Sequence, residues 1–200
     1  ARPTFIDIDG DGDLDAFVGV GARYTFFFQN TGTADNPSFI LNDSGAPFGL
    51  GSNRNSAPLN FVDIDGDGDL DAFLGMGHYS GSGGIIFFRN IGTASNPAFY
   101  RDSLNPFGLG SMGIYLSPEF VDIDDDGDID SFIGSEHGSM FFENTSMASI
   151  PYFGGGMAFG SSNVMGGYNR TPVFVDIDGD GDLDAFVGKQ NYYGESDGTI

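Results

Sequence analysis

Four nine-residue acidic segments recur along the chain and hold most of its acidic side chains. They cover residues 7–15, 63–71, 122–130 and 176–184, and we call them Asp loops 1 to 4. Three read Asp-Ile-Asp-Gly-Asp-Gly-Asp-Leu-Asp, and loop 3 reads Asp-Ile-Asp-Asp-Asp-Gly-Asp-Ile-Asp. Two carboxylates about 4 Å apart repel by about 1 kcal/mol in water and by about 4 kcal/mol near a protein surface. The chemistry expected of such a segment is capture of a hard cation that cancels this repulsion.

The spacing within each Asp loop is that of a site for one ion. Carboxylates at positions 1, 3 and 5 point inward as the chain curls, glycine at position 6 allows the sharp turn, and position 7 can offer its carbonyl. Position 9 completes the site. Calcium accepts six to eight oxygen ligands in a flexible geometry, so the sequence predicts about four Ca²⁺ ions. The alternative is a solvated acidic turn without an ion, and four copies with the same positions argue against it. The candidate ligands are Asp7, Asp9, Asp11, Asp13, Asp15, Asp63, Asp65, Asp67, Asp69, Asp71, Asp122, Asp124, Asp126, Asp128, Asp130, Asp176, Asp178, Asp180, Asp182 and Asp184.

The residues beside the Asp loops exclude the helix–loop–helix calcium motif. That motif needs a bidentate Glu at position 12, where this chain has Val18, Leu74, Ile133 and Val187. Short runs rich in Phe and β-branched residues precede and follow each loop, and such runs bounded by glycine are typical of strands. Each Asp loop is therefore predicted to connect two antiparallel strands.

The loops belong to a longer internal repeat with periods of 56, 59 and 54 residues. A third apolar run ends in Asn in three repeats, at Tyr24 to Asn30, Ile85 to Asn90 and Met140 to Asn144. A fourth strand is predicted at Ser38 to Ile40 and at Ala98 to Tyr100, followed by a Pro-Phe-Gly-Leu-Gly turn. Three to four strands in each repeat predict an all-β fold, a β-propeller with one blade per repeat and phenylalanines packed between blades.

The predicted domain is a single propeller, or a fragment of one, over residues 1–200, with repeats starting near 3, 58, 118 and 172. The fourth repeat stops at Ile200, about 30 residues before the pattern would restart. A first residue other than Met favours a mature or excised segment. Because open strand edges attract partners, the incomplete repeat predicts head-to-tail self-association into a filament or surface fibre.

Composition excludes several classes of protein. The net charge is −22 with only 7 Lys and Arg, which argues against nucleic acid as a partner. Four calcium ions would reduce the net charge to −14. There is no cysteine for a disulfide framework, and no apolar run approaches the roughly 20 residues of a membrane span. Low-affinity calcium loops suit the near-millimolar calcium outside cells, so the predicted location is extracellular, either secreted or at the cell surface.

The repeated sequence Phe-Val-Asp-Ile-Asp-Gly-Asp-Gly-Asp-Leu-Asp-Ala-Phe-Val-Gly, at residues 174–188, resembles the FG-GAP/VCBS repeat family. The resemblance covers all four repeats. It implies a β-propeller with one calcium loop per blade, in which the side chains at positions 1, 3, 5 and 9 and the carbonyl at position 7 bind the ion. Members of that family occur in integrin-type adhesion heads, bacterial surface proteins and lectins, or beside catalytic domains. Many have seven blades, whereas this chain has four repeats.

The function expected from these observations is a calcium-binding extracellular structural or adhesive module. An alternative is a calcium-dependent, lectin-like propeller that binds glycans, with loop tyrosines stacking on sugar rings. Ordinary loop aromatics would have the same appearance in the sequence. Other surface proteins are a further class of partner. The tyrosines in question are Tyr79, Tyr115, Tyr168, Tyr192 and Tyr193.

An enzyme is not expected. The aspartates resemble the paired carboxylates of glycoside hydrolases, but their repetition at metal-ligand spacing argues against that role. His78 and His137 have no recognisable Ser, Cys or metal partner in the sequence. Three sequons, at Asn42, Asn144 and Asn169, match the acceptor pattern for N-glycosylation.

Overall fold

The computed structural model describes residues 3–20, 24–42, 46–51, 59–76, 83–110, 112–146, 150–158 and 168–190. These residues form four antiparallel sheets, and none of them lies in an α-helix. The predicted all-β class is therefore confirmed. No helix of membrane-spanning length and hydropathy occurs in the part of the chain that is described.

Each sheet is a meander in which strands adjacent in sequence pair with one another. The first sheet contains β1 (Pro3–Ile6), β2 (Asp15–Val20), β3 (Tyr24–Asn30) and β4 (Phe39–Asn42). The second contains β5 (Leu59–Val62), β6 (Asp71–Gly75), β7 (Ile85–Asn90) and β8 (Phe99–Leu104). The third contains β9 (Ser117–Val121), β10 (Asp130–Gly134), β11 (Ser139–Phe142) and β12 (Met157–Ala158). The fourth contains β13 (Tyr168–Val175) and β14 (Asp184–Gln190).

Every Asp loop connects the first two strands of its sheet, as the sequence predicts. The register is the same each time: the residue before position 1 pairs with the aspartate at position 9, as Val62 does with Asp71 and Val121 with Asp130. Because side chains alternate between the two faces of a strand, this common register sends equivalent side chains to equivalent faces in all four sheets.

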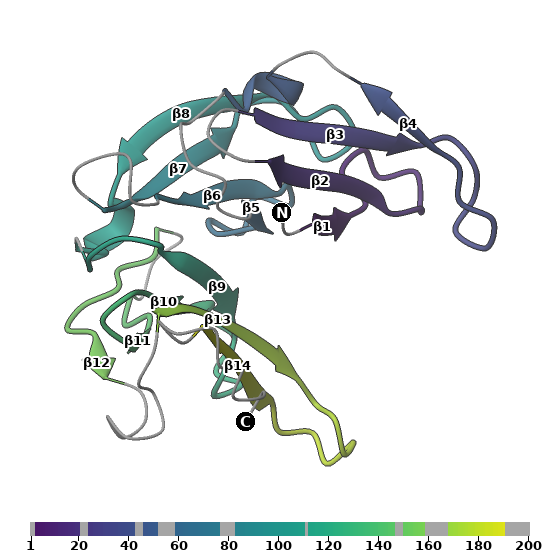
Figure 1. Ribbon diagram of the computed structural model, residues 1–200. Helices are drawn as coiled ribbons and strands as arrows, with labels where there is room; N and C mark the ends of the chain where they lie inside the picture. The colour runs from purple at the N-terminus through teal and green to yellow at the C-terminus, as the bar shows by residue number, and fades with distance from the viewer. Residues whose placement is uncertain are drawn as a thin grey trace.

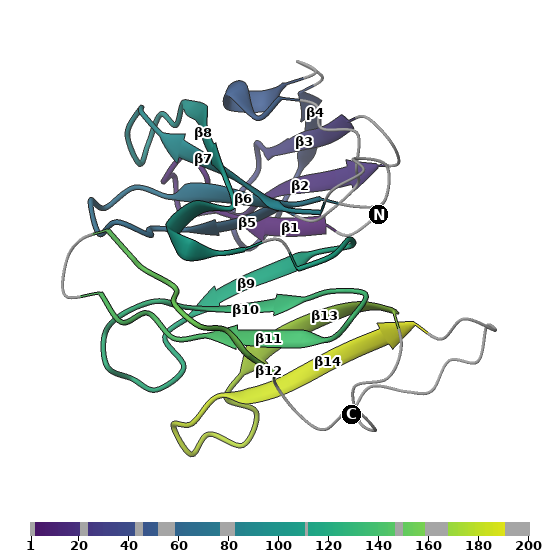
Figure 2. The same ribbon diagram turned by 90° about the vertical axis from the view of Figure 1, so that its left-hand side faces the viewer.

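The sheets follow one another along an arc, with the first and fourth sheets at its ends (Figures 1 and 2). The first strands lie innermost, so that β1 contacts β5, β5 contacts β9, and β9 contacts β13. The second sheet therefore has a neighbour on each face. All five residues of its strand β6 are buried, which explains why the sequence there is apolar without alternation.

Phenylalanines fill the space between sheets. In each junction a ring from the second strand of one sheet packs against a ring from the first strand of the next. The distances between ring centroids are 4.9 Å for Phe17 and Phe61, 4.1 Å for Phe73 and Phe120, and 5.1 Å for Phe132 and Phe174. Full burial of such a side chain contributes about 1.5–3 kcal/mol. The predicted role of these residues as core is confirmed.

A short turn ties each of the first two sheets to the next one. In η1 (Pro47–Gly49) and η3 (Pro106–Gly108) the central Phe and the following Gly both have positive φ. The second turn accepts a hydrogen bond from the Phe153 N–H to the Phe107 carbonyl, at 2.7 Å. In the first turn, a Cβ on Gly49 would overlap the carbonyl oxygen of Phe99 in the second sheet.

The structure corrects four boundaries. In the third repeat, strand β11 covers Ser139–Phe142 rather than Met140 to Asn144. The fourth strand of the first sheet is Phe39–Asn42 rather than Ser38 to Ile40, and its counterpart in the second extends to Leu104. Tyr168, predicted in a loop, begins β13, because an irregularity in register between Tyr168 and Thr171 lets that strand continue past Pro172 to pair with β14. The fourth sheet has two strands among the described residues, and residues 191–200 lie outside them.

We predict that Gly49→Ala destabilises the protein by about 2–4 kcal/mol. A backbone φ of +91° is strained for alanine, and the added Cβ would clash with the carbonyl oxygen of Phe99. At roughly 2–4 °C per kcal/mol, Tm falls by about 4–16 °C. Gly51→Ala is the matched control, since a Cβ there has nothing within 4 Å. Thermal melts followed by circular dichroism compare the two variants. Equal melting temperatures would contradict this account of the turn.

Candidate metal centres

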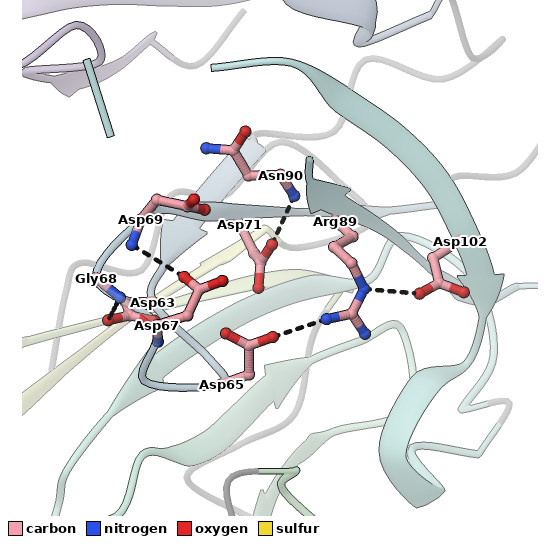
Figure 3. Close-up of polar contacts among 9 residues, drawn as sticks. All are labelled: Asp63, Asp65, Asp67, Gly68, Asp69, Asp71, Arg89, Asn90 and Asp102. Carbon is pink, nitrogen blue, oxygen red and sulfur yellow. Dashed lines mark hydrogen bonds and ion pairs between the residues drawn. The ribbon is translucent and has the colours of Figure 1, made fainter. Parts of the chain in front are cut away.

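The aspartate at position 1 organises each Asp loop through backbone hydrogen bonds. In loop 2, Asp63 accepts from the N–H groups of Asp67 and Gly68 at 3.1 and 3.0 Å (Figure 3). In loop 3 the corresponding distances to Asp122 are 3.2 and 3.0 Å. Position 5 acts similarly on position 7, as Asp67 accepts from the Asp69 N–H at 3.1 Å. The chain is thus wound around its own carboxylates.

Two residues in each loop have left-handed backbone conformations. Glycine at position 6 has φ between +93° and +99° in all four loops, so the predicted sharp turn is confirmed. Position 4 is also left-handed, and loop 3 places Asp125 there at φ 59°. Aspartate is one of the few non-glycine residues that tolerates this region, which accounts for the replacement of glycine at position 4 of loop 3.

The winding brings the carboxylates of positions 1, 3 and 5 together in every loop. One oxygen from each of the three lies within 4.8 Å of the others, a separation that a single metal ion can bridge. The four groups are Asp7, Asp9 and Asp11; Asp63, Asp65 and Asp67; Asp122, Asp124 and Asp126; and Asp176, Asp178 and Asp180.

Positions 3, 7 and 9 carry buried oxygens without a hydrogen-bond partner in loops 1 and 2. In loop 2 these atoms are Asp65 Oδ1, Asp69 Oδ1 and Asp71 Oδ2, and the equivalent three atoms recur in loop 1. A buried carboxylate oxygen that accepts no hydrogen bond is costly unless a cation satisfies it. The donor set consists of hard oxygens alone, which suits Ca²⁺ or Mg²⁺ and not a soft metal.

The aspartate at position 9 connects its loop to the end of the third strand. Asp71 Oδ1 accepts a hydrogen bond from the Asn90 N–H at 2.7 Å, and the Asp15–Asn30 and Asp130–Asn144 pairs are equivalent at 2.7 and 2.8 Å. Both partners in each pair are buried. The other oxygen of Asp71 is one of the unpartnered atoms, so this carboxylate is held by the protein on one side only.

The asparagine side chain extends the connection to the next turn. Asn90 Oδ1 accepts from the N–H groups of Gly92 and Ala98 at 2.9 and 3.0 Å, which closes the turn between β7 and β8. Asn30 does the same in the first sheet. The sequence contained the signal, an Asn at the end of the third apolar run in three repeats, but its partner depends on strand pairing that spacing alone does not give.

Loop 2 has an additional partner that the sequence analysis also missed. Arg89 Nη1 contacts Asp65 Oδ2 at 2.7 Å, while its Nε contacts Asp102 Oδ2 at 3.2 Å (Figure 3). In the first sheet the same position is Gln29, whose Nε2 is 3.4 Å from Asp9 Oδ2. A positively charged side chain therefore lies beside position 3 in loop 2, and a neutral amide takes its place in loop 1.

Burial dominates the electrostatics of the position 9 carboxylates. It raises the pKa of Asp71 to about 7 and that of Asp15 to about 6, against the opposing hydrogen bonds from Asn90 and Asn30. Burial also raises the pKa of Asp130. At position 7, burial and then the neighbouring loop carboxylates raise the pKa of Asp69. The protein holds these groups where ionisation is unfavourable without a nearby positive charge.

The loops are not identical in how much of the predicted ligand set they bury. Position 7 is exposed in loops 3 and 4, at Asp128 and Asp182, and position 9 is exposed in loop 4, at Asp184. In loops 3 and 4 the second oxygen of position 9 accepts from the backbone N–H of position 2, at 3.4 and 3.2 Å. The carboxylates at positions 1, 3 and 5 are thus common to all loops, whereas the outer positions vary.

The remaining sequence candidates lie elsewhere. Tyr79, Tyr192, Tyr193 and His78 are outside the described residues, and His137 is exposed, 3.5 Å from the Glu136 carboxylate. Tyr115 is exposed in a turn with φ 57°.

The sequons differ in accessibility. Asn42 is exposed at the end of β4, whereas Asn144 is 8% exposed and its Oδ1 accepts hydrogen bonds from Ser146 and from the Tyr152 N–H. Burial makes Asn144 an unsuitable acceptor in the folded chain. The side chain of Asn169 is not among those described.

Comparisons with known proteins add no assignment. No protein-family model matches the chain, and no curated protein matches it.

We predict that the metal-free protein loses stability as pH rises from about 4 to about 7. Asp71 and Asp15 have folded-state pKa values above the ordinary 3.8, so the folded state binds more protons than the unfolded state in this range. Tm should fall by about 5 °C or more between pH 4.5 and pH 7.5 in chelator. Asp71→Asn removes one of the two groups and should flatten the slope. A Tm that rises with pH in chelator would contradict the prediction.

Proposed function

We propose that the protein is a calcium-binding structural or adhesive repeat module of the FG-GAP/VCBS type, with one Ca²⁺ in each Asp loop. The observation that carries the proposal is the convergence of three carboxylates within 4.8 Å in all four loops. The unpartnered buried oxygens of loops 1 and 2 support it, because they supply further ligands at positions 3, 7 and 9.

Calcium fits these loops better than magnesium. Magnesium requires near-ideal octahedral geometry and retains several waters, whereas calcium accepts six to eight oxygens in an irregular arrangement. The loops offer up to five carboxylates and vary in how far positions 7 and 9 are exposed. A flexible donor set that tolerates this variation is the kind that calcium uses.

The ions act on the fold, since each Asp loop is the hairpin between the two inner strands of its sheet. With a Kd of about 0.1 mM and calcium at about 1 mM, each site stabilises the folded state by about 1.4 kcal/mol. Four sites together contribute about 5–6 kcal/mol, comparable with the whole stability of a modest domain. Sites of this affinity are filled outside cells, which favours a secreted or cell-surface location.

The arrangement of the sheets supports a β-propeller, in which each sheet is a blade and β1, β5, β9 and β13 line the inside. Four meander sheets in chain order along an arc, each packed on the next, are the local pattern of that fold. A non-enzymatic role fits carboxylates whose positions are repeated as ligands in every sheet. No described tyrosine cluster favours the carbohydrate-binding alternative.

Calorimetric titration of chelator-treated protein with calcium tests the proposal. We expect about four ions per chain and an increase in Tm of about 10–20 °C between excess chelator and about 1 mM calcium. Asp122→Asn should remove one ion from the stoichiometry, because position 1 is both a ligand and the organiser of its loop. Asp35→Asn, at an exposed position outside the loops, is the matched control. An identical melt in calcium and in chelator would refute the proposal.

We further predict that Arg89 makes loop 2 a weak calcium site. Its guanidinium lies 2.7 Å from the Asp65 carboxylate, so a calcium ion that binds in loop 2 is repelled by a fixed positive charge. Arg89→Gln introduces the residue found at the same position of the first sheet and should raise the affinity of loop 2 about tenfold. The reciprocal Gln29→Arg should lower the affinity of loop 1 by a similar factor.

Resolved binding steps in the same titration measure both changes. Asp102→Asn is the control for stability, because it removes the second ion pair of Arg89 and leaves the contact with Asp65. If Arg89→Gln leaves every binding step unchanged while the protein still binds calcium, Arg89 has no influence on the site.

A further inference from the structure

The outer face of the first sheet is apolar, and no sheet formed by the described residues packs on it. Phe5, Ala16, Phe28 and Leu41 form one cross-strand row on this face, and Phe39 lies beside it. Phe5 is 54% exposed, and Phe39 and Leu41 are each 44% exposed. We call these five residues the head face. Exposed apolar surface of this kind on a folded protein marks an interaction site.

The second sheet shows what this face is built to contact. By register, Phe5, Ala16, Phe28 and Phe39 correspond to Phe61, Ala72, Phe88 and Phe99. Of those four, Phe88 and Phe99 are 2% and 5% exposed, because the first sheet covers them. Even the aromatic geometry is repeated: the Phe5–Phe39 centroids are 6.3 Å apart, and the Phe61–Phe99 centroids are 5.9 Å apart. The head face is therefore a preformed half of a sheet junction.

The complementary half lies on the fourth sheet, at the other end of the arc. Val173, Val175 and Ile177 are 45%, 43% and 65% exposed, and Phe186 is partly exposed. We call these four residues the tail face. The residues equivalent to Ile177 in loops 1 and 2, Ile8 and Ile64, are 2% and 6% exposed inside the junctions.

Phe186 belongs to the same comparison. It occupies the position of Phe17, Phe73 and Phe132, each of which packs against a ring of the following sheet and is at most 2% exposed. The ring that each of these meets is the counterpart of Phe5. Phe186 thus occupies the position whose ring contacts the counterpart of Phe5 in every internal junction, whereas Val173 stands where the other sheets have Thr4, Asn60 and Glu119.

We propose that the head face of one copy of this chain packs on the tail face of a second copy, in the same geometry as the internal sheet junctions. The two faces lie at opposite ends of the arc in one molecule (Figures 1 and 2), so each copy presents both halves of the contact. A second copy is favoured over an unrelated partner, because Phe186 and Phe5 occupy the positions of the two rings that meet in every internal junction. Such a head-to-tail contact is heterologous and propagates into a ring or a filament.

The contact uses stacked faces, and it differs from completion of the fourth sheet by added edge strands. It is also independent of how calcium acts, although the two are linked through charge. Copies that each carry −22 repel one another, and any bound cations reduce that repulsion. Association should therefore be stronger in calcium than in chelator.

Sedimentation velocity of the 200-residue chain in about 1 mM calcium tests the proposal over about 1–100 µM protein. Wild-type protein should associate with increasing concentration. Phe5→Glu damages only the head face and Val175→Glu only the tail face, and each should weaken association by about 30-fold or more. Both residues are exposed enough for a charge to be tolerated in the folded monomer. Ile91→Glu, at an exposed turn outside both faces, is the matched control and should associate as wild type.

Mixing the two variants gives the decisive result. Phe5→Glu retains a tail face and Val175→Glu retains a head face, so an equimolar mixture should form a dimer, although neither variant does so alone. Association of either variant alone, whether by like faces or by strand edges, would overturn the proposal, as would a wild type that stays monomeric at every concentration. Calcium titration of monomeric Phe5→Glu separates this outcome from failure of the calcium proposal.

Discussion

The buried carboxylate at position 9 is the constraint on which the first three repeats depend. It lies where the acidic hairpin meets the core, one oxygen tied to the backbone of the third strand and the other facing the loop. Burial opposes ionisation of this carboxylate and raises the pKa of Asp71. The cluster of carboxylates beside it has the same electrostatic problem, which is negative charge without a compensating positive charge. A cation in the loop would solve this problem and would fix the hairpin and the third strand together.

The sheets are joined by a second, apolar principle. In every junction, a phenylalanine from the second strand of one sheet packs against a phenylalanine from the first strand of the following sheet. Because all hairpins have the same register, these rings lie at equivalent positions along their strands. Loop geometry therefore determines the packing of whole sheets. If the winding of a loop changed, the rings that it aligns would shift as well.

Much of this could be predicted from the sequence, because the same pattern occurs in four repeats and each copy can be compared with the others. The strands Tyr24–Asn30 and Ile85–Asn90 have the expected bounds, and the convergence of positions 1, 3 and 5 follows from local spacing. The contacts of Asn90 and Arg89 could not be predicted, since they depend on which strands pair and in what register. Tyr168 was placed wrongly because a proline four residues later signals a boundary that the paired strand overrides.

The Pro-Phe-Gly turn has a consequence for how such a chain can change in length. Each of the two described turns belongs to one repeat by sequence but contacts the following sheet, at Phe99 in β8 or at Phe153, which precedes β12. A gene duplication that copies one whole period supplies both halves of this contact and of the ring pair, wherever its endpoints fall within the period. Recombination between repeats therefore preserves every junction, which makes the number of sheets an easily varied property.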